Sequence, residues 1–396
     1  MEFGKYYRRG NIKVNIRGID MKKILVLGAG PSQLDLVVKA KEMGMEVYGC
    51  GKSGNEEVLS QFDGFKQIDI CDEEAVEEYA REINADFLFT MGLEIALPII
   101  TNVSTKLGLP NFFSQESLAK LKNKACWREV LGDIDGNLKF KSGSCIEDFE
   151  DWNTFPAVLK PADGSGQRGV HKVESFEDIK EVFDLSISYS RSHTLILEEF
   201  ADGEEISVNS FMYNNKLAAY VPSDRISYTE YPGGIIKEHH IPSKLSVGDC
   251  DDRVRKLVET VNQKMGFENG HVYFQIKIKD GRPQLIEFTP RFDGCHMWRL
   301  VMYATGLDLR QCSLEWLATG HVEEFDNGFE CVVKPGSFKT KFISDKPGTV
   351  VDKKNYDLDD DRIYTQWYYN DGDKVKSVTG YLEKVGFVMV KNDGTN

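Results

Sequence analysis

Short apolar runs alternate with amphipathic stretches in the first part of the chain, and this alternation limits the fold more than any other feature. The run KKILVLGAG after Met21 leads into an amphipathic stretch at 33–43 and a second apolar run, MEVYGC. A helical stretch at 73–83, the strand-like DFLFTMG and another helical stretch at 95–107 follow. Strands and helices that alternate at this spacing predict a parallel sheet with helices on both faces.

The pattern changes after Pro110. Residues 114–130 predict a pair of helices, and longer extended runs follow, with hairpin turns at 214–215 and 280–281 that predict a mainly antiparallel sheet. The last 75 or so residues have short alternating strands. The expected fold class is therefore α/β: a Rossmann-like domain, an α+β domain and a small β-rich C-terminal region. The expected segments are a flexible extension at 1–20 and domains at 21–110, 111–320 and 321–396.

Composition excludes several classes of function. The 396 residues include 49 Lys and Arg against 63 Asp and Glu, a net charge of −14 that disfavours a nucleic-acid partner. No apolar stretch reaches the roughly 18 to 20 residues of a membrane span. The eight cysteines form no C-x-x-C pair and predict reduced thiols in the cytoplasm. Residues 1–20 lack the apolar core of a secretory signal, and we expect a natural start at Met21.

Two glycine-containing turns in the first domain resemble nucleotide-binding motifs without completing them. The turn at 28–33 has Gln33 where a dinucleotide fingerprint has its third glycine, which favours a tight strand-to-helix turn with no bound dinucleotide. The segment 51–53, Gly-Lys-Ser, resembles the end of a P-loop. Glu46 stands where the first P-loop glycine belongs, so we interpret this segment as a solvated loop.

Three motifs in the second domain could form a phosphate and nucleotide site. An apolar strand at 155–161 contains Lys160 and leads into a glycine-rich loop at 163–170, whose backbone N–H groups could fold over a phosphate. A second apolar strand ends in acids at 198–205, which could contact a purine and a ribose. Taken alone, the first could be a simple turn and the second a solvated acidic turn.

The third motif is the hairpin that ends at residue 291. Alternation along its second strand places Glu287, Thr289 and Arg291 on one face. An acid and an arginine at this spacing could hold Mg²⁺ and a transferred phosphate together. The other interpretation is a cross-strand ion pair.

In order and spacing, these motifs resemble the ATP-grasp superfamily from about residue 22 to 390, in its carboxylate–amine ligase type. The first domain is similar to the pre-ATP-grasp domain of carbamoyl phosphate synthase large subunits and biotin carboxylases. The resemblance implies ATP as the nucleotide. It implies phosphate-binding lysines, a mobile glycine-rich lid, an adenine-contacting segment and a ribose acid, in that order: Lys124 and Lys160; Gly164, Ser165, Gly166 and Gly169; Glu198, Glu199, Phe200 and Ala201; and Glu205.

The metal site departs from the family pattern. The resemblance assigns Glu287 to Mg²⁺, with Mn²⁺ as an alternative ion. However, Tyr273 stands where an acid or Gln is usual, and Thr289 stands where Asn is usual. Gln275 faces the same way as Tyr273 and could bind the metal instead. In the other interpretation, one Mg²⁺ is held mainly by Glu287 and the nucleotide phosphates.

The segment after the hairpin contains the expected substrate contacts. The resemblance places Asp293, His296 and Arg299 where the family contacts its acceptor, and Arg225 in a loop that often lines the substrate pocket. His296 could equally be a helix-start residue that local backbone satisfies.

The implied activity is that of an ADP-forming ligase. A small-molecule carboxylate is phosphorylated to an acyl phosphate, and an amine then attacks the acyl phosphate. Arg291 and Lys160 are the implied catalytic residues. The protein could form a homodimer. A small-molecule kinase on the same fold is the first alternative. An NAD(P) oxidoreductase would leave the second half of the chain unexplained. A regulator that binds nucleotide without chemistry is disfavoured by Lys160, Glu287 and Arg291.

Overall fold

The computed structural model describes residues 21–164, 168–231 and 234–392. They form two compact units. The first comprises the chain up to Gln115 together with Leu309–Phe329, and the second comprises Glu116–Asp308 and the chain from Glu330 onward. The predicted extension at 1–20 lies outside the described residues.

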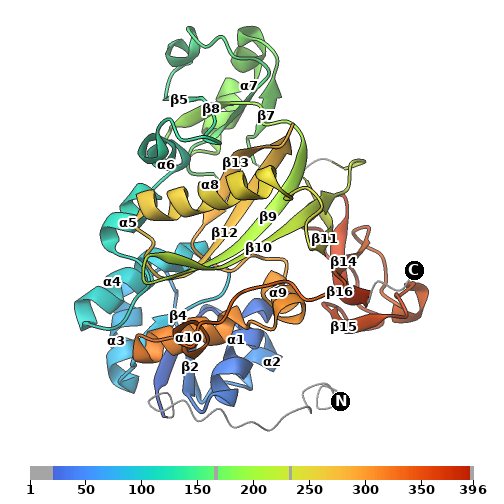
Figure 1. The fold of residues 1–396 in the computed structure, drawn as a ribbon. Coiled ribbons are helices and arrows are strands. Elements are labelled where there is room, and N and C mark those ends of the chain that lie inside the picture. The colour runs from blue at the N-terminus through green and yellow to red at the C-terminus, as the bar shows by residue number, and fades with distance from the viewer. Residues whose placement is uncertain (1–20, 165–167, 232–233, 393–396) are drawn as a thin grey trace. The chain divides into compact units, whose positions relative to one another are not determined.

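The first unit is built on the predicted parallel sheet. Its strands, two of which (β2 and β4) are labelled in Figure 1, run in the order β3-β2-β1-β4, with β1 paired in parallel to both β2 and β4. Residues 24–27 of β1 are fully buried. The sheet prediction is confirmed. Its elements are β1 (Lys23–Leu27), α1 (Pro31–Glu42), β2 (Glu46–Gly51), α2 (Glu56–Leu59), β3 (Gly64–Gln67), α3 (Glu73–Ile83), β4 (Phe87–Phe89), η2 (Glu94–Ala96), α4 (Leu97–Leu107), α10 (Leu309–Thr319) and α11 (Glu323–Asp326).

The turn between β1 and α1 is closed by a side chain of its own. Gln33 accepts a hydrogen bond from the Gly30 N–H at 3.0 Å and donates one to the Met91 carbonyl at 2.6 Å. Gly28 has φ +96°, and a Cβ there would lie 2.5 Å from a Leu93 methyl carbon. This geometry agrees with a tight strand-to-helix turn rather than a dinucleotide cradle.

Residues 309–329 belong to the first unit, which differs from the predicted limits of 111–320 and 321–396. Helix α10 buries Leu309, Leu314 and Leu317. Arg310 donates a hydrogen bond to the Asp35 carbonyl of α1, at 3.2 Å. The Trp316 ring stacks on Phe112 at 4.8 Å. These partners lie about 200 to 275 residues earlier in the chain, so no local pattern could indicate them.

The second unit begins with a small antiparallel sheet in the order β5-β8-β6-β7. Helix α7 packs on β6 and β7 and covers an apolar core that includes Phe149, Leu159 and Leu197. The elements of this part are α5 (Gln115–Lys120), α6 (Lys124–Leu131), β5 (Phe140–Gly143), η3 (Ile146–Phe149), β6 (Ala157–Pro161), β7 (His171–Val173), α7 (Phe176–Ser188) and β8 (Leu195–Glu199).

An antiparallel sheet of eight strands follows, in the order β13-β12-β9-β10-β11-β14-β16-β15. The two predicted hairpin turns are confirmed, because Asn214, Asn215, Asp280 and Gly281 all have φ between +51° and +69°. The elements are β9 (Glu204–Tyr213), β10 (Lys216–Ser227), β11 (Ile236–Ile241), α8 (Asp249–Met265), β12 (Gly270–Lys279), β13 (Arg282–Thr289), α9 (Met297–Thr305), β14 (Ser337–Asp345), η4 (Lys353–Asn355), β15 (Arg362–Trp367) and β16 (Glu383–Asn392).

The C-terminal strands are part of this large sheet. We expected them to form a separate small region, but β14 pairs with β11 along residues 338–341. β16 and β15 then extend the sheet beyond β14. The sheet therefore joins the central part of the chain to its last strands.

The two faces of the large sheet differ in polarity. Helix α8 lies on one face of the sheet (Figure 1). Its apolar stripe is buried there, and so are Val272, Phe274 and Ile276 of β12. The alternate residues of β12, Tyr273 and Gln275, lie on the opposite face, which we call the polar face. Period-two alternation separates the two sets.

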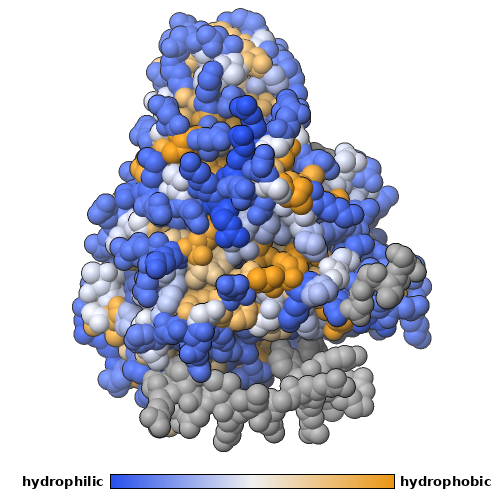
Figure 2. All heavy atoms as spheres, viewed as in Figure 1, coloured by the Kyte–Doolittle hydropathy of each residue, from blue (hydrophilic) through white to orange (hydrophobic). Residues whose placement is uncertain are grey.

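The surface seen in Figure 2 is mostly hydrophilic, with apolar residues in separate small patches. Among the described residues, no helix has both the length and the apolar character that crossing a bilayer requires.

Candidate active site

The polar face brings the predicted metal residues together. In the strand register, Glu287 of β13 lies opposite Gln275 of β12, and Gln275 lies opposite Ser207 of β9. Glu287 is 46% exposed, so its carboxylate is open to a ligand. The Tyr273 hydroxyl is hydrogen-bonded to the Ser207 hydroxyl at 2.7 Å and is buried. Gln275 therefore lies where it could replace Tyr273 as the metal ligand from β12, and its role as a ligand stays a prediction.

Lys124 links this hairpin to the start of the glycine-rich loop. It is the first residue of α6, which Asn123 caps by accepting a hydrogen bond from the Cys126 N–H. The Lys124 ammonium donates to the Gly164 carbonyl at 2.8 Å and lies 3.9 Å from a Glu287 oxygen. Three segments that are far apart in sequence therefore meet at one lysine.

Lys160 is held by a buried acid. Its ammonium lies 2.5 Å from Glu198, whose other oxygen accepts a hydrogen bond from Arg128 at 2.9 Å. Burial opposes ionisation of Glu198, but the two cations outweigh it and lower the pKa of Glu198 to about 2. The acid is therefore ionised at neutral pH and fixes the position of Lys160.

Sequence reasoning missed Arg128. This fully buried arginine stacks on Trp127 and also donates hydrogen bonds to Asn137 and to the Leu285 carbonyl of β13. The sequence contains a pattern that indicates this buried arginine. Positions 125, 128 and 131 lie on the buried face of α6, and only position 128 is charged. A charged residue on an apolar helical face predicts a buried ion pair.

The predicted adenine segment follows β8 directly. Glu199 accepts a hydrogen bond from the Lys139 N–H at 3.1 Å, the Phe200 N–H donates to the Pro156 carbonyl at 3.0 Å, and Ala201 is buried. The backbone of this segment is therefore tied to its neighbours on both sides. Gly164 and Gly169 are described, the latter with φ +68°, whereas the predicted loop residues Ser165 and Gly166 lie outside the described residues.

The predicted ribose acid and one predicted substrate residue form a pair. Glu205 of β9 accepts a hydrogen bond from Arg225 of β10 at 2.6 Å. Burial raises the pKa of Glu205, although Arg225 acts in the opposite direction. The Arg225 side chain is 10% exposed, and its Nε has no hydrogen-bond partner among the described residues.

The residues after β13 adopt a helix-start geometry. Arg291 donates to the Phe292 carbonyl at 2.9 Å. Asp293 caps α9 by accepting hydrogen bonds from the N–H groups of Cys295 and Met297, both at 3.1 Å. Burial raises the pKa of Asp293 to about 6.

His296 fits the interpretation as a helix-start residue. Its φ is +57° at the N-cap of α9, its ring stacks on Phe387, and its Nε2 lies 3.0 Å from the Tyr368 hydroxyl. The guanidinium of Arg299 stacks over the Tyr364 ring. Both side chains therefore have aromatic partners within the protein, and substrate contact by either stays a prediction.

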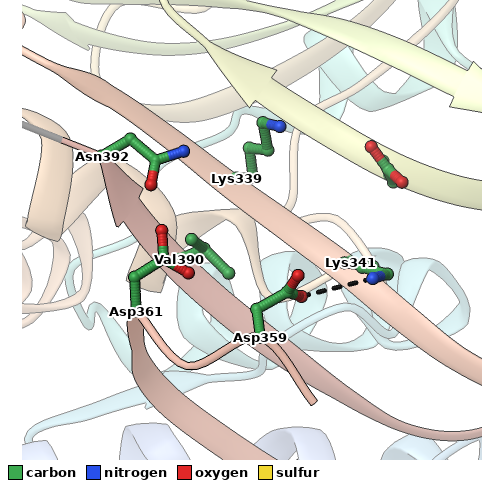
Figure 3. Close-up of a pocket in the computed structure, with 7 residues that line it drawn as sticks. Lys339, Lys341, Asp359, Asp361, Val390 and Asn392 are labelled. Atoms are coloured by element: carbon green, nitrogen blue, oxygen red, sulfur yellow. Dashed lines mark hydrogen bonds and ion pairs between the residues drawn. The ribbon is translucent and has the colours of Figure 1, made fainter. Parts of the chain in front are cut away.

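A pocket lies on the face of strands β11 and β14 that is opposite the polar face (Figure 3). Three carboxylates and two ammonium groups line it, and Lys341 pairs with Asp359 at 3.3 Å. It contains none of the motif residues. It is lined by Glu238, Lys339, Lys341, Asp359, Asp361, Val390 and Asn392.

Comparisons with known proteins agree with this fold. Residues 153–298 match the family model of the ATP-grasp domain. A phosphoribosylamine–glycine ligase of Methanococcus maripaludis is 25% identical over 304 residues, which cover 68% of this chain and 67% of that protein. Two solved structures cover nearly the whole chain. Phosphoribosylglycinamide synthetase from Anaerococcus prevotii has a TM-score of 0.76 at 19% identity, covering 94% of this chain and 95% of that one. L-amino acid ligase from Bacillus licheniformis has a TM-score of 0.78 at 17% identity, covering 95% and 94%. The predicted fold class is confirmed.

Proposed function

From the premise that this chain belongs to the ATP-grasp superfamily, we propose that it is an ATP-dependent, ADP-forming ligase that joins a small carboxylic acid to an amine. The single observation that best supports this reaction is the meeting of Lys124, Gly164 and Glu287 beside the strand that holds Lys160. Two relatives named above are ligases whose names include an amino acid.

In the proposed complex, the nucleotide phosphates lie beside Lys124 and Lys160. Two ammonium groups offset much of the phosphate charge, and Glu198 keeps Lys160 in place without neutralising Lys124. The backbone at 198–201 would contact the adenine. Glu205 would accept hydrogen bonds from ribose hydroxyls, and its present partner Arg225 shows that its carboxylate already works as an acceptor.

The donor set of the hairpin fits a hard divalent cation. Glu287 and Gln275 offer carboxylate and amide oxygens from directly opposed strand positions, and oxygen donors are what Mg²⁺ and Mn²⁺ prefer. When bound, Mg²⁺ would offset phosphate charge and orient the terminal phosphate. Glu287 would hold it, with Gln275 as the second protein ligand.

The chemistry then needs positioning and charge stabilisation rather than a nucleophilic side chain. A carboxylate oxygen of the acid attacks the γ-phosphorus, ADP leaves, and an acyl phosphate forms. The amine attacks the acyl carbon, phosphate leaves, and the amide remains. Arg291, two residues after the end of β13, would stabilise the transferred phosphoryl group and then the oxyanion of the tetrahedral intermediate.

A product experiment tests this reaction. The protein is incubated with Mg·ATP and pools of carboxylates, with and without amines, and ADP, free phosphate and new masses are followed. A ligase gives ADP, phosphate and a product whose mass is the sum of both substrates less one water. A stable phosphorylated product without free phosphate, formed without an amine, would identify a kinase and contradict the proposal.

Location and assembly are part of the same proposal. All eight cysteines are free thiols, and four of them are at least partly exposed: Cys71, Cys126, Cys145 and Cys331. This supports a cytoplasmic location. A homodimer stays a prediction.

A further inference from the structure

A cluster of polar groups lies on the polar face, beyond the predicted catalytic hairpin. The polar atoms of His239, Asp293 and Cys295 all lie within 4.8 Å of one another, and all three residues are buried. The Lys384 ammonium lies 3.7 Å from the Cys295 sulfur and sits over the Phe342 ring, 3.5 Å from its centroid. Strand β11, the start of α9 and strand β16 therefore contribute to one site.

The two charged members of this cluster are not paired with each other. Among the described residues, Asp293 accepts hydrogen bonds from two backbone N–H groups, and no lysine or arginine nitrogen lies within 4.0 Å of it. The nearest groups to Lys384 are a thiol and an aromatic face, with no carboxylate within 4.0 Å in the described part of the chain. Asp293 is buried and Lys384 is partly buried. Opposite charges in such surroundings normally pair, because a buried charge without a counter-charge is costly.

Two neutral groups beside them also lack partners. Neither ring nitrogen of His239 has a hydrogen-bond partner among the described residues, and the same holds for the Thr340 hydroxyl. These residues lie opposite each other on β11 and β14. Thr340 stands between Lys339 and Lys341, which line the pocket in Figure 3, so alternation points Thr340 to the polar face. Buried polar atoms without partners indicate that a ligand or water completes the site.

We propose that this cluster binds an α-amino acid as the amine substrate, with its ammonium at Asp293 and its carboxylate at Lys384 and His239. The proposal rests on the ligase function above. One carboxylate and one ammonium, both unpaired and both beside Cys295, match the two opposite charges of a zwitterion.

This orientation also fits the reaction. Asp293 is two residues from Arg291, so the amino group would point toward the acyl phosphate and the carboxylate away from it. Asp293 takes one proton from the ammonium, and the free amine attacks the acyl carbon. The nitrogen loses its second proton to the departing phosphate. The product would be an amide that keeps a free carboxylate at Lys384.

Two other occupants fit less well. His, Asp and Cys are a ligand set that suits Zn²⁺. However, the cations facing the cluster are Lys384 from β16, Arg225 from β10 and Arg291 after β13, and they oppose a further cation. A dicarboxylate would meet Lys384 favourably but would be repelled by Asp293.

Calorimetry in the presence of Mg·ADP tests the proposal without requiring turnover. The protein-forming L-amino acids are titrated singly, and each one that binds is compared with its 2-hydroxy acid and its decarboxylated amine. We expect both analogues to bind about tenfold more weakly or worse, since each loses one charged hydrogen-bonding group. An analogue that binds as well as the amino acid would overturn the proposal.

Two variants test separately which residue binds the ammonium of the amino acid and which binds its carboxylate. Asp293→Asn should weaken the amino acid about tenfold and leave the 2-hydroxy acid unchanged, whereas Lys384→Met should weaken both carboxylate-containing ligands and leave the amine unchanged. Lys339→Met and Asp361→Asn, in the pocket of Figure 3, are matched controls with no expected effect. Unchanged Mg·ADP binding verifies that each variant is folded.

The outcomes separate this inference from the ligase function. Amino-acid binding with the expected variant pattern, but no amide with any acid, would retain the inference and reject the ligase. Amide formation from amines without a carboxylate, unaffected by both variants, would retain the ligase and reject the inference. Stoichiometric Zn²⁺ that His239→Ala abolishes would also reject it.

Discussion

The glycine-rich turn at 28–33 and the glycine-rich loop that starts at Gly164 both follow a buried strand, and they differ in what surrounds them. The turn at 28–33 in the first unit is closed by Gln33, whose amide satisfies the local backbone and is buried. The loop that starts at Gly164 in the second unit has Lys124 at its first glycine and Lys160 in the preceding strand. Glycines permit a phosphate loop, but the adjacent charges decide whether a phosphate is bound.

The same contrast applies to two lysines. Lys52, in the Gly-Lys-Ser segment that resembles a P-loop, is exposed and paired with Asp69 at 2.7 Å. Lys160 is buried and positioned by an acid that a second cation also binds. A surface ion pair stabilises little and fixes little, whereas a buried network fixes geometry. Every residue of the proposed nucleotide and metal site therefore lies in the second unit.

The largest expected effect is at Glu287. Glu287→Gln keeps the size of the side chain and removes the charge that would hold the metal, so turnover should fall about a thousandfold or more. Circular dichroism and thermal unfolding should be unchanged, because Glu287 is half-exposed. Turnover within tenfold of wild type would contradict the assignment of Glu287 as a metal ligand.

The next effect is on stability at acid pH. The pKa of Glu198 is lowered to about 2 in the folded protein from an ordinary 4.5, so its contribution is present above pH 4.5 and is lost as pH falls toward 2. That contribution is on the order of 3 kcal/mol. Urea unfolding of wild type and Glu198→Gln should show a difference that shrinks over this window. A difference independent of pH would mean that Glu198 is not ionised.

A smaller effect separates the two lysines. Lys160→Met should weaken Mg·ATP binding about tenfold or more, because a phosphate loses a charged partner. Lys52→Met is the matched control in the first unit and should bind Mg·ATP as wild type does. Equal weakening in both variants, measured by calorimetry, would remove the distinction between the two regions.

The smallest effect concerns Gln33. Gln33→Ala removes two hydrogen bonds from a buried turn and should lower the free energy of unfolding by about 1–3 kcal/mol. It should leave Mg·ATP affinity unchanged. A large loss of nucleotide affinity in a variant that remains folded would assign the first turn a role in binding.

Local patterns predicted much of this molecule, and long-range packing accounts for the rest. The parallel sheet and the hairpin turns follow from alternation and turn residues within short segments. The placement of α10 depends on Phe112 and on the Asp35 carbonyl, and the C-terminal strands join the sheet through β11. In both cases the partner residues are distant in sequence from the segment that they contact.

In the candidate site, too, local motifs predict some residues, whereas others depend on long-range contacts. The order of motifs predicts Lys124, Lys160 and Glu287 as site residues without any knowledge of their contacts. Arg128 and Lys384 were missed, because each acts through a neighbour contributed by a distant element. The second lies in strand β16, which the sequence alone did not connect to the rest of the site.

Nucleotide choice tests the central claim most directly. Calorimetry with Mg·ADP and with NADH, on the wild-type protein, asks which region binds a nucleotide. We expect the protein to bind one equivalent of Mg·ADP, more weakly in Lys160→Met and equally well in Lys52→Met, and to give no heat with NADH. Tight NADH binding without Mg·ADP binding, lost when the turn at 28–33 is altered, would contradict it.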